Sequence, residues 1–528
     1  MWALFREPCD ENLIRSGNAS ASPLKSHGGW ILAATILASS MAMIDGTVVN
    51  VALPALQANL NATAVDVQWV IEAYSLLLSA FLLVGGALGD HYGRRRIFVI
   101  GVALFALASV VCGFASDIRQ LIAARALQGL GAALLVPGSL AIISASFSEN
   151  ERGRAIGTWS GASAITTAIG PVMGGWLIEH ISWRAVFFIN LPLAVAVILI
   201  SLRHISENKN SEENRIDWVG AILAALGLGA LVYGLIESSR FGFHNRSVIF
   251  VLIVAGIALA VFLLVEARLS KPMLPLELFR SRIFAGTNLL TFLLYAALGG
   301  TLFFLPLNLI QIQHYSPTAA GATLLPFIII ISFLSRWSGG LIAKYGPRPP
   351  LIVGPLIAAV GYALFLLPNV GGSYSRTFLP PVVLLGIGMA ISIAPLTTAV
   401  MNSVAQNRVG IASGVNNAIA RTAGLIAIAA LGIVMLHTFG LRFDRHLSKL
   451  DLPPAALQSL RSQVTSLAAI SIPKDLDPAT QAMIRQAVAE SFVSGFRAIM
   501  AIGAMLAIAG AATSLALIRT GPPNQTRR

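Results

Sequence analysis

Charged residues and cysteines are both scarce in this chain. Asp, Glu, Lys and Arg make up 11% of its 528 residues, whereas soluble globular proteins carry about 25%. A composition this poor in charge, with 56% apolar residues, excludes a water-soluble enzyme and indicates an integral membrane protein. The two cysteines, Cys9 and Cys112, are too few for a disulfide framework.

The chain also lacks the motifs of several other protein classes. No lysine follows a glycine, so the phosphate-binding loop of ATP-driven proteins is absent. The 8 His and 2 Cys form neither an HExxH nor a paired CxxC motif, so the sequence predicts no metal site and no cofactor. The net charge of +13 comes from small basic groups between apolar runs, and without a basic stripe we expect no nucleic-acid partner. An enzyme is therefore the weakest candidate function.

Long apolar runs fill most of the sequence. Because a helix needs about 20 mostly apolar residues to cross a bilayer, the sequence predicts an all-α membrane protein with fourteen transmembrane helices. Their expected ranges are 30–54, 66–89, 96–115, 118–141, 154–178, 184–203, 216–237, 248–266, 283–311, 318–343, 350–368, 378–401, 408–436 and 495–518. Residues 1–29 and 519–528 are expected to be tails, and 437–494 a loop with short amphipathic helices.

Basic residues are distributed unevenly between the loops. About fifteen lie in the loops on one side, and about five lie in the short loops on the other side. Since cytoplasmic loops carry the excess of Lys and Arg, the first set is expected to be cytoplasmic. We therefore expect a multi-pass protein of the inner (plasma) membrane with both termini in the cytoplasm and 437–494 outside.

A weak internal repeat relates two parts of the chain at a displacement of about 253 residues. Gly86, Leu88, Tyr92, Gly93 and Arg95 recur as Gly339, Leu341, Tyr345, Gly346 and Arg348, and Gly157 and Gly161 recur as Gly410 and Gly414. The repeat predicts two parallel six-helix bundles, 30–203 and 283–518, on either side of a two-helix insertion, 204–282. This organisation is typical of transporters that rock two halves about a central site.

Four short motifs occur in order on the predicted helices. The second span ends in Gly86-Ala-Leu-Gly-Asp90-His-Tyr-Gly93-Arg94-Arg95-Arg96, and the fifth contains Gly170-Pro171-Val-Met-Gly174-Gly175. The first contains Asp45-Gly-Thr-Val-Val-Asn50-Val-Ala-Leu-Pro54, and the fourth contains Arg125, Gln128, Gly129 and Gly131. These stretches resemble motifs A and C, the first-span motif of the 14-span drug:proton antiporters, and motif B of the major facilitator superfamily. The resemblance covers nearly the whole chain and implies the major-facilitator fold.

A proton-coupled carrier needs an acid inside the membrane, where acids are costly and usually functional. No Asp or Glu lies between Glu277 and Asp444, so the proton site is expected in the first half. Asp45 is the leading candidate, about 14 Å from the end of its span at 1.5 Å per residue. Arg125 is expected at a similar depth, where it favours the ionised carboxylate; a purely structural role of Asp45 is the alternative. Glu72 is the rival carrier, although its place near the end of its span favours a wet interfacial carboxylate.

The resemblance assigns roles to two of the motifs. In the family, motif A contributes to a charge cluster that stabilises one conformation, which implies this role for Gly86, Asp90, Gly93 and Arg94. Motif C marks antiporters, and implies a close, dry contact between the bundles at Gly170, Pro171, Gly174 and Gly175. Positive-inside topology and ordinary small-residue packing are the simpler explanations for these arginines and glycines.

Polar and aromatic residues near mid-depth are candidates for a substrate cavity, although packing explains each of them equally well. They are Trp69, Tyr74, Gln128, Phe304, Asn308, Gln311, Asn416 and Arg421. Arg421 has no nearby acid in its own bundle, so it would favour anionic or neutral substrates.

Together these features favour a proton-coupled secondary exporter (antiporter) of amphipathic drugs or other organic compounds that works by alternating access. Its partners would be a small organic substrate, protons and the lipid bilayer, and a periplasmic adaptor protein is left open. Two alternatives remain. One is a proton-coupled symporter that imports a small metabolite, since the fold hosts both directions; the other is a non-transporting membrane receptor or scaffold.

Overall fold

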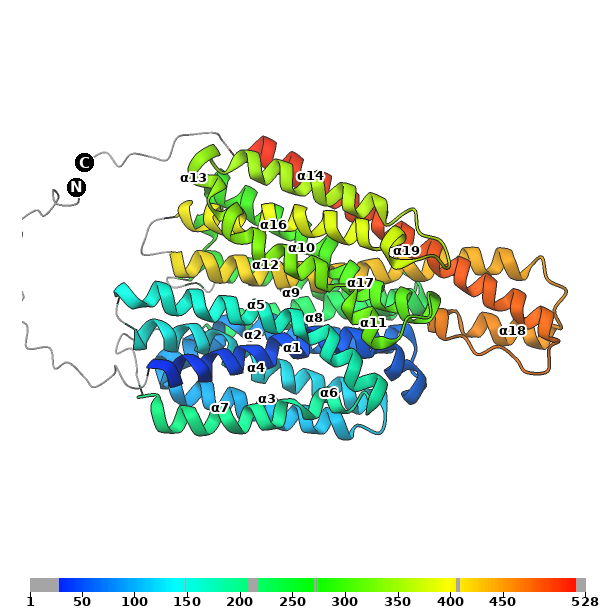
Figure 1. Cartoon of the computed structure of the whole chain (residues 1–528), viewed down its shortest axis with the longest axis horizontal. Helices are drawn as coiled ribbons and strands as arrows, with labels where there is room; N and C mark the ends of the chain where they lie inside the picture. The colour runs from blue at the N-terminus through cyan, green and yellow to red at the C-terminus, as the bar shows by residue number, and fades with distance from the viewer. Residues whose placement is uncertain are drawn as a thin grey trace, which may run out of the picture.

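The chain folds into an elongated assembly of helices (Figure 1). The computed structural model describes residues 28–147, 149–207, 217–269, 272, 274–404 and 409–518. Every regular element within these ranges is helical, and none is a strand. We call the end where α1 begins and α19 ends the terminal end, and the opposite end, where α18 projects, the loop end.

The first bundle extends from α1 to α7. Its helices are α1 (Gly28–Leu60), α2 (Ala64–Tyr92), α3 (Arg94–Phe114), α4 (Ile118–Ser146), α5 (Glu149–His180), α6 (Ala185–Phe188) and α7 (Asn190–His204). α4 packs against α1, α2 and α3, and α1 also packs against α5 and α7. Side chains from α1, α3, α4 and α7 therefore meet inside this bundle.

Two helices separate the bundles in sequence. α8 (Trp218–Phe241) and α9 (Arg246–Arg268) pack against each other, and η2 (Leu276–Arg280) leads into the next helix. α8 also packs against α2 of the first bundle and α17 of the second. The insertion therefore lies where the two bundles meet.

The second bundle repeats the packing of the first. Its elements are α10 (Arg282–Leu307), η3 (Asn308–Ile312), α11 (Pro317–Ala322), α12 (Leu325–Gly339), α13 (Leu341–Tyr345), α14 (Arg348–Leu364), α15 (Tyr374–Thr377), α16 (Leu379–Asn402), α17 (Val409–Leu447), α18 (Pro454–Ser462), η5 (Val464–Ala469) and α19 (Pro478–Leu517). α10 packs against α17 and α19, as α1 packs against α5 and α7, and α14 packs against α16, as α3 packs against α4.

The repeated turn keeps its backbone geometry in both copies. Gly93 has φ +113° between α2 and α3, and Gly346 has φ +75° between α13 and α14. These values lie in the region that glycine adopts without steric cost. Both copies of the repeat therefore keep a glycine at this turn because the backbone there has a positive φ.

Polar side chains cap three helices that begin at the loop end. Thr63 and Asp66 form a reciprocal capping box at α2, with Asp66 Oδ2 accepting from the Thr63 amide at 2.8 Å. Asp117 and Asp477 cap α4 and α19 through their side chains. Caps of this kind satisfy the free amides of the first helical turn.

Residues 437–494, which the sequence predicts as a loop, are mostly helical. α17 continues to Leu447 and α19 begins at Pro478, so both helices extend past the ends predicted for their spans. α18 and η5 connect them at the loop end, where the hairpin projects from the bundles (Figure 1). η5 contacts α1 and α2 as well as α17 and α19, so the hairpin is seated on both bundles.

The described residues contain twelve helical segments long and apolar enough to cross a membrane. The protein is therefore a multi-pass membrane protein. α5 is not among the twelve, and α14 has only 17 residues. The predicted number of fourteen spans is thus not confirmed and stays a prediction.

Candidate functional site

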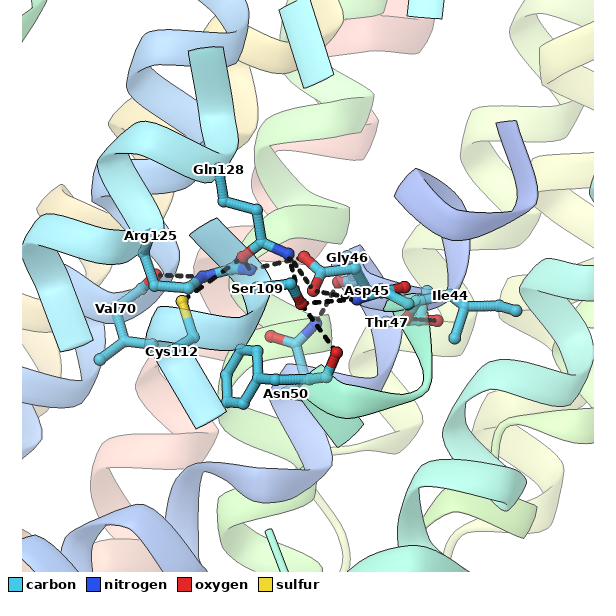
Figure 2. A network of polar contacts seen from close by, with 12 residues as sticks. Ile44, Asp45, Gly46, Thr47, Asn50, Val70, Ser109, Cys112, Arg125 and Gln128 are labelled. Atoms are coloured by element: carbon cyan, nitrogen blue, oxygen red, sulfur yellow. Dashed lines mark hydrogen bonds and ion pairs between the residues drawn. The ribbon is translucent and has the colours of Figure 1, made fainter. Parts of the chain in front are cut away.

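Asp45 and Arg125 form an ion pair inside the first bundle (Figure 2). Arg125 Nη1 donates to Asp45 Oδ2 at 2.5 Å, and Gln128 Nε2 donates to Asp45 Oδ1 at 2.9 Å. The relative exposures of the Asp45, Arg125 and Gln128 side chains are 0%, 1% and 0%. Asp45 thus faces the interior of the bundle, and both of its oxygens are hydrogen-bonded there.

Three polar residues that the sequence did not single out complete this network. Asn190 of α7 donates to Asp45 Oδ1 at 3.5 Å and to Ser109 Oγ of α3 at 3.0 Å. Gln128 Nε2 also donates to Ser109, at 3.3 Å, and Cys112 Sγ donates to Gln128 Oε1 at 3.7 Å. The only signal for these residues was their polarity within apolar runs, because they come from separate helices with no spacing code.

Arg125 has further partners that do not depend on the charge of Asp45. Its Nε donates to the carbonyl of Val70 at 3.1 Å, and its Nη1 donates to Gln128 Oε1 at 2.7 Å. Its guanidinium carbon lies 4.3 Å from the centre of the Tyr74 ring, within the range of a cation–π contact. A proton on Asp45 would therefore remove the counter-charge of Arg125 and leave these three contacts in place.

The helix surface next to Asp45 borders open space. Gly46 is exposed, and no atom lies within 4 Å of the position that a Cβ would occupy. Asn50 donates to the Gly46 carbonyl at 3.0 Å from the same face of α1, and both residues are drawn beside Asp45 in Figure 2. The enclosed carboxylate is thus one residue away from accessible backbone.

Glu72 does not join the Asp45 network. Its side chain is 0% exposed, so the expectation of a wet interfacial carboxylate is wrong. Neither of its carboxylate oxygens has a hydrogen-bond partner among the described residues. Nearby on α2, Gln68 contacts α17 and Trp69 contacts α8.

The turn between α2 and α3 holds a second charged cluster. Arg94 Nε donates to Asp90 Oδ1 at 2.8 Å, and Arg94 Nη1 donates to the carbonyl of Ala141 in α4 at 3.4 Å. The carboxylate of Glu207, which follows α7, accepts from the amides of Arg95 and Arg96 at 3.1 Å each. Sequence reasoning missed Glu207, because it is one of several acids in the loop after α7 and belongs to no motif.

The glycines of α5 permit close contacts on two sides. A Cβ on Gly170 would overlap Thr47 Oγ1, and one on Gly174 would lie 2.7 Å from Val48 Cγ1, both in α1. A Cβ on Gly175 would instead overlap the carbonyl of Pro317, at the start of α11 in the second bundle. α5 continues as a helix through Pro171. Of the four residues, Pro171 and Gly175 therefore contact the second bundle, at Gly321 and Pro317, while Gly170 and Gly174 pack within their own bundle.

Hydrogen bonds join the two bundles at the loop end. Gln311 Nε2 donates to Gln57 Oε1 at 2.7 Å, and Gln68 Nε2 donates to the carbonyl of Ile428 at 2.6 Å. Thr318 Oγ1 donates to Glu179 Oε2 at 2.6 Å. We call this set of contacts the loop-end seam. The bundles are closed against each other there.

The family model of the Major Facilitator Superfamily matches residues 35–429. The chain belongs to the major facilitator superfamily. This membership confirms the resemblance carried by the four motifs and fits a transporter rather than an enzyme.

Similar major facilitator proteins are named for drug resistance or export. The chain is 35% identical to the multidrug resistance protein Stp of Mycobacterium tuberculosis, covering 79% of this chain and 78% of that protein. It is 31% identical to the tetracenomycin C resistance and export protein of Streptomyces glaucescens, covering 94% and 92% of the two chains. It is 36% identical to the puromycin resistance protein pur8 of Streptomyces alboniger, over 80% and 86%.

Solved structures share the major-facilitator fold at low sequence identity. A bacterial homologue of the human lysosomal transporter Spinster, in an inward-facing unoccupied conformation, aligns with a TM-score of 0.64 and 18% identity over 93% of this chain and 98% of that chain. The xylose transporter XylE from E. coli, in an inward-open conformation, aligns with a TM-score of 0.54 and 14% identity over 93% and 96%. These likenesses confirm the fold.

The residues proposed for the substrate cavity do not form one cluster in this major facilitator structure. Gln128 belongs to the Asp45 network, Gln311 belongs to the loop-end seam, and Trp69 packs on Tyr233 of α8 at 5.9 Å between ring centres. Asn416 donates to Asn288 and Thr291 of α10 at 3.1 and 2.7 Å.

The other cavity candidates have different surroundings. Asn308 accepts from Gln313 at 3.2 Å, and Phe304 packs on Phe303. Tyr74 and Tyr295 lie within electrostatic range of Arg421, which is half-buried. Arg421 has no acidic partner among the described residues, so α2, α10 and α17 meet around an unneutralised cation.

Proposed function

We propose that this chain is a proton-coupled secondary exporter of amphipathic organic compounds. The observation that carries the proposal is the buried Asp45–Arg125 pair, whose partners span α1, α3, α4 and α7. No Asp or Glu lies between Glu277 and Asp444, which supports one embedded carboxylate as the coupling group. The names of the relatives, which include multidrug resistance, tetracenomycin C export and puromycin resistance, support organic drugs as the substrate class.

The coupling step is the transfer of a proton to and from Asp45. With the loop end closed, Arg125 and Gln128 hold the ionised carboxylate, and its proton leaves toward the terminal end as substrate enters from that side. When the bundles rock and the loop end opens, substrate leaves and Asp45 accepts a proton from the loop-end side. Arg125 keeps Val70, Gln128 and Tyr74 as partners in the protonated state, which limits the cost of losing its counter-ion.

One proton supplies enough energy for useful export. Moving one charge across 100 mV releases about 2.3 kcal/mol. At an assumed potential of roughly 150 mV, one proton supports a several-hundred-fold gradient of a neutral compound. ATP is therefore not required.

We further propose that the terminal end faces the cytoplasm in an inner (plasma) membrane, because the basic loops cluster at that end. The two bundles, 30–203 and 283–518, are the moving units. The insertion, 204–282, packs against both bundles where they meet. The charge cluster around Asp90 and Arg94 steadies the terminal-end turn in this conformation. A periplasmic adaptor forms no part of the proposal.

The test is uphill transport by the purified protein in proteoliposomes with an imposed pH gradient. The first compounds to test are puromycin and tetracenomycin C, which appear in the names of two relatives. A wider panel of toxic organic molecules follows. We expect accumulation that collapses when a protonophore is added. A compound that moves only down its own gradient, or in the same direction as the proton, would reject export by proton exchange.

A further inference from the structure

Glu72 is an acid that the coupling step above does not use. It lies in α2, its side chain is 0% exposed, and neither carboxylate oxygen has a hydrogen-bond partner among the described residues. An ionised carboxylate in such a place lacks both water and a counter-charge, which strongly disfavours the charged form. In this conformation Glu72 is therefore in the neutral, protonated form.

Glu72 lies on the helix face that contributes to the loop-end seam. Glu72 is four residues from Gln68, so both side chains lie on one face of α2. Gln68 Nε2 donates to the carbonyl of Ile428 in α17, and a Cβ on Gly432 would lie 2.6 Å from that nitrogen. The same face of α2 is thus pressed against the opposite bundle, and Glu72 is about 6 Å deeper than Gln68 at 1.5 Å per residue.

No charged group compensates Glu72 from the helices around it. The helices α4, α17 and α8, which pack against α2, carry the ionisable residues Arg125, Arg421 and Tyr233. Arg125 is bonded to Asp45, Gln128 and Val70, Arg421 lies within range of Tyr74 and Tyr295, and Tyr233 packs on Trp69. On the remaining neighbours, Asp45 of α1 and Cys112 of α3 belong to the Asp45 network, and η5 carries no ionisable side chain.

We propose that Glu72 is a second proton site that reports the state of the loop-end seam: it holds a proton while the seam is closed and releases it to the loop-end side when the seam opens. This inference rests on the alternating access of the proposed function. Opening the seam would separate Gln68 from Ile428 and admit water to the same face of α2, where hydration stabilises the carboxylate. Low pH on the loop-end side therefore favours closure.

The ligand is a proton rather than a metal ion. A hard cation needs several oxygen ligands around it, and the described residues contain no cluster of three or more His, Cys, Asp or Glu side chains. A proton needs only the carboxylate itself.

Glu72 differs from Asp45 in what it does with the proton. Asp45 lies next to the accessible Gly46, whereas Glu72 is enclosed when the loop end is closed. Glu72 thus exchanges its proton with one side only. It adds pH dependence to closing without adding a transported proton per substrate.

The experiment measures the distance across the loop end as a function of pH. Spin labels are attached at Asn59→Cys in α1 and Ser375→Cys in α15, both exposed, in a Cys9→Ser background that leaves the buried Cys112 unlabelled. Double electron–electron resonance is recorded in lipid nanodiscs between about pH 9 and pH 5, without substrate. The background also carries Glu179→Gln, because protonation of this seam residue favours opening, whereas protonation of Glu72 favours closure.

We expect the ratio of closed to open molecules to rise as the pH falls, by at most about tenfold per pH unit for one linked proton. Glu72→Gln, which mimics the protonated form, should keep at every pH the high closed fraction that the wild type reaches at low pH, while Glu72→Asp should keep the pH dependence. In proteoliposomes, Glu72→Gln should leave the number of protons exchanged per substrate unchanged. A Glu72→Gln protein with the wild-type pH profile, or one that transports fewer protons per substrate, would overturn the proposal.

The distance measurement separates this inference from the proposed function. It needs no substrate, so a protein without proton-driven export could still show the Glu72-dependent closure. Conversely, export driven by protons with no pH dependence of the seam would reject the Glu72 inference alone. Thermal unfolding of each variant checks that the isosteric substitution has not disturbed folding.

Discussion

Gly321 of α11 lies directly against the backbone carbonyl of Pro171 in α5, so that a Cβ at position 321 would overlap this oxygen. The contact joins the two bundles at the loop end, beside the equally close approach of Gly175 to Pro317. Because both partners are backbone groups, neither can move aside as a side chain could. Closure of the loop end therefore depends on the absence of side chains at two glycines, one from each bundle.

Gly321→Ala should shift the protein away from the closed loop end. The added methyl group meets a backbone carbonyl, so the bundles can accommodate it only by separating. We expect a larger fraction of open molecules in the spin-label measurement and at least a tenfold loss of export, about 1.4 kcal/mol per tenfold. Gly256→Ala is the matched control, since nothing lies within 4 Å of its Cβ position in α9. Equal behaviour of the two variants would contradict the close-contact interpretation.

Removing one partner of the Asp45–Arg125 pair should destabilise the protein more than removing both. Arg125→Met leaves an uncompensated buried acid, and breaking a buried pair in this way costs about 3 kcal/mol. The double variant Asp45→Asn and Arg125→Gln removes both charges and should recover most of the thermal unfolding midpoint, although not transport. Additive losses of stability in the double variant would show that the pair does not act as a unit.

Glu179 should make the seam sensitive to acid. It lies beyond the predicted span of α5, and hydrogen bonds from Thr318 and Ser316 hold the pKa of its carboxyl below its ordinary value of 4.5. A lowered pKa in the closed state means that Glu179 stabilises closure above this ordinary value, and that the stabilisation is lost as the pH falls through the lowered pKa. Spin-label distances should report a falling closed fraction below about pH 4.5, under the pH range in which Glu72 favours closure. Glu179→Gln should abolish this acid-induced opening; if the variant still opens as the wild type does, another group is responsible.

The two turn glycines offer a comparison within one molecule. Gly93→Ala adds a strained positive φ and a contact with the Glu207 carboxylate, since its Cβ would lie 2.5 Å from Oε1. Gly346→Ala adds only the strain, because nothing lies within 4 Å of its Cβ position. We expect each to lose about 1 kcal/mol from strain, and Gly93→Ala to lose more. Gly93→Ala should lower the unfolding midpoint less in a Glu207→Ala background than in the wild type, and an equal loss in both backgrounds would argue against the contact.

Part of the candidate site could be predicted from the sequence because it lies in recognisable motifs. Asp45, Arg125 and Gln128 each belong to a stretch of fixed spacing on its helix, and an acid and an arginine at similar depth attract each other. Gln128 was nevertheless expected in a substrate cavity, since spacing within α4 does not show that its amide turns toward α1. Asn190 and Ser109 could not be predicted, because their contacts depend on how α3 and α7 pack.

The fold was more predictable than the contacts between the bundles. Hydropathy predicted the helices, and the repeat predicted both the similar packing around α1 and α10 and the shared turn at Gly93 and Gly346. The burial of Glu72 was not predicted because its distance from the end of α2 says nothing about the helices beside it. A close contact between the bundles was predicted at Pro171, but its partner Gly321 was not, since sequence spacing does not show which backbone of the second bundle approaches.

The central claim is tested most directly by Asp45→Asn in proteoliposomes loaded with a compound that the wild type exports. Two rates are compared in the same preparation: exchange of labelled for unlabelled compound without a gradient, and accumulation driven by an imposed pH difference. The account predicts that exchange survives within a few-fold, whereas pH-driven accumulation disappears. Full pH-driven accumulation by Asp45→Asn would contradict it.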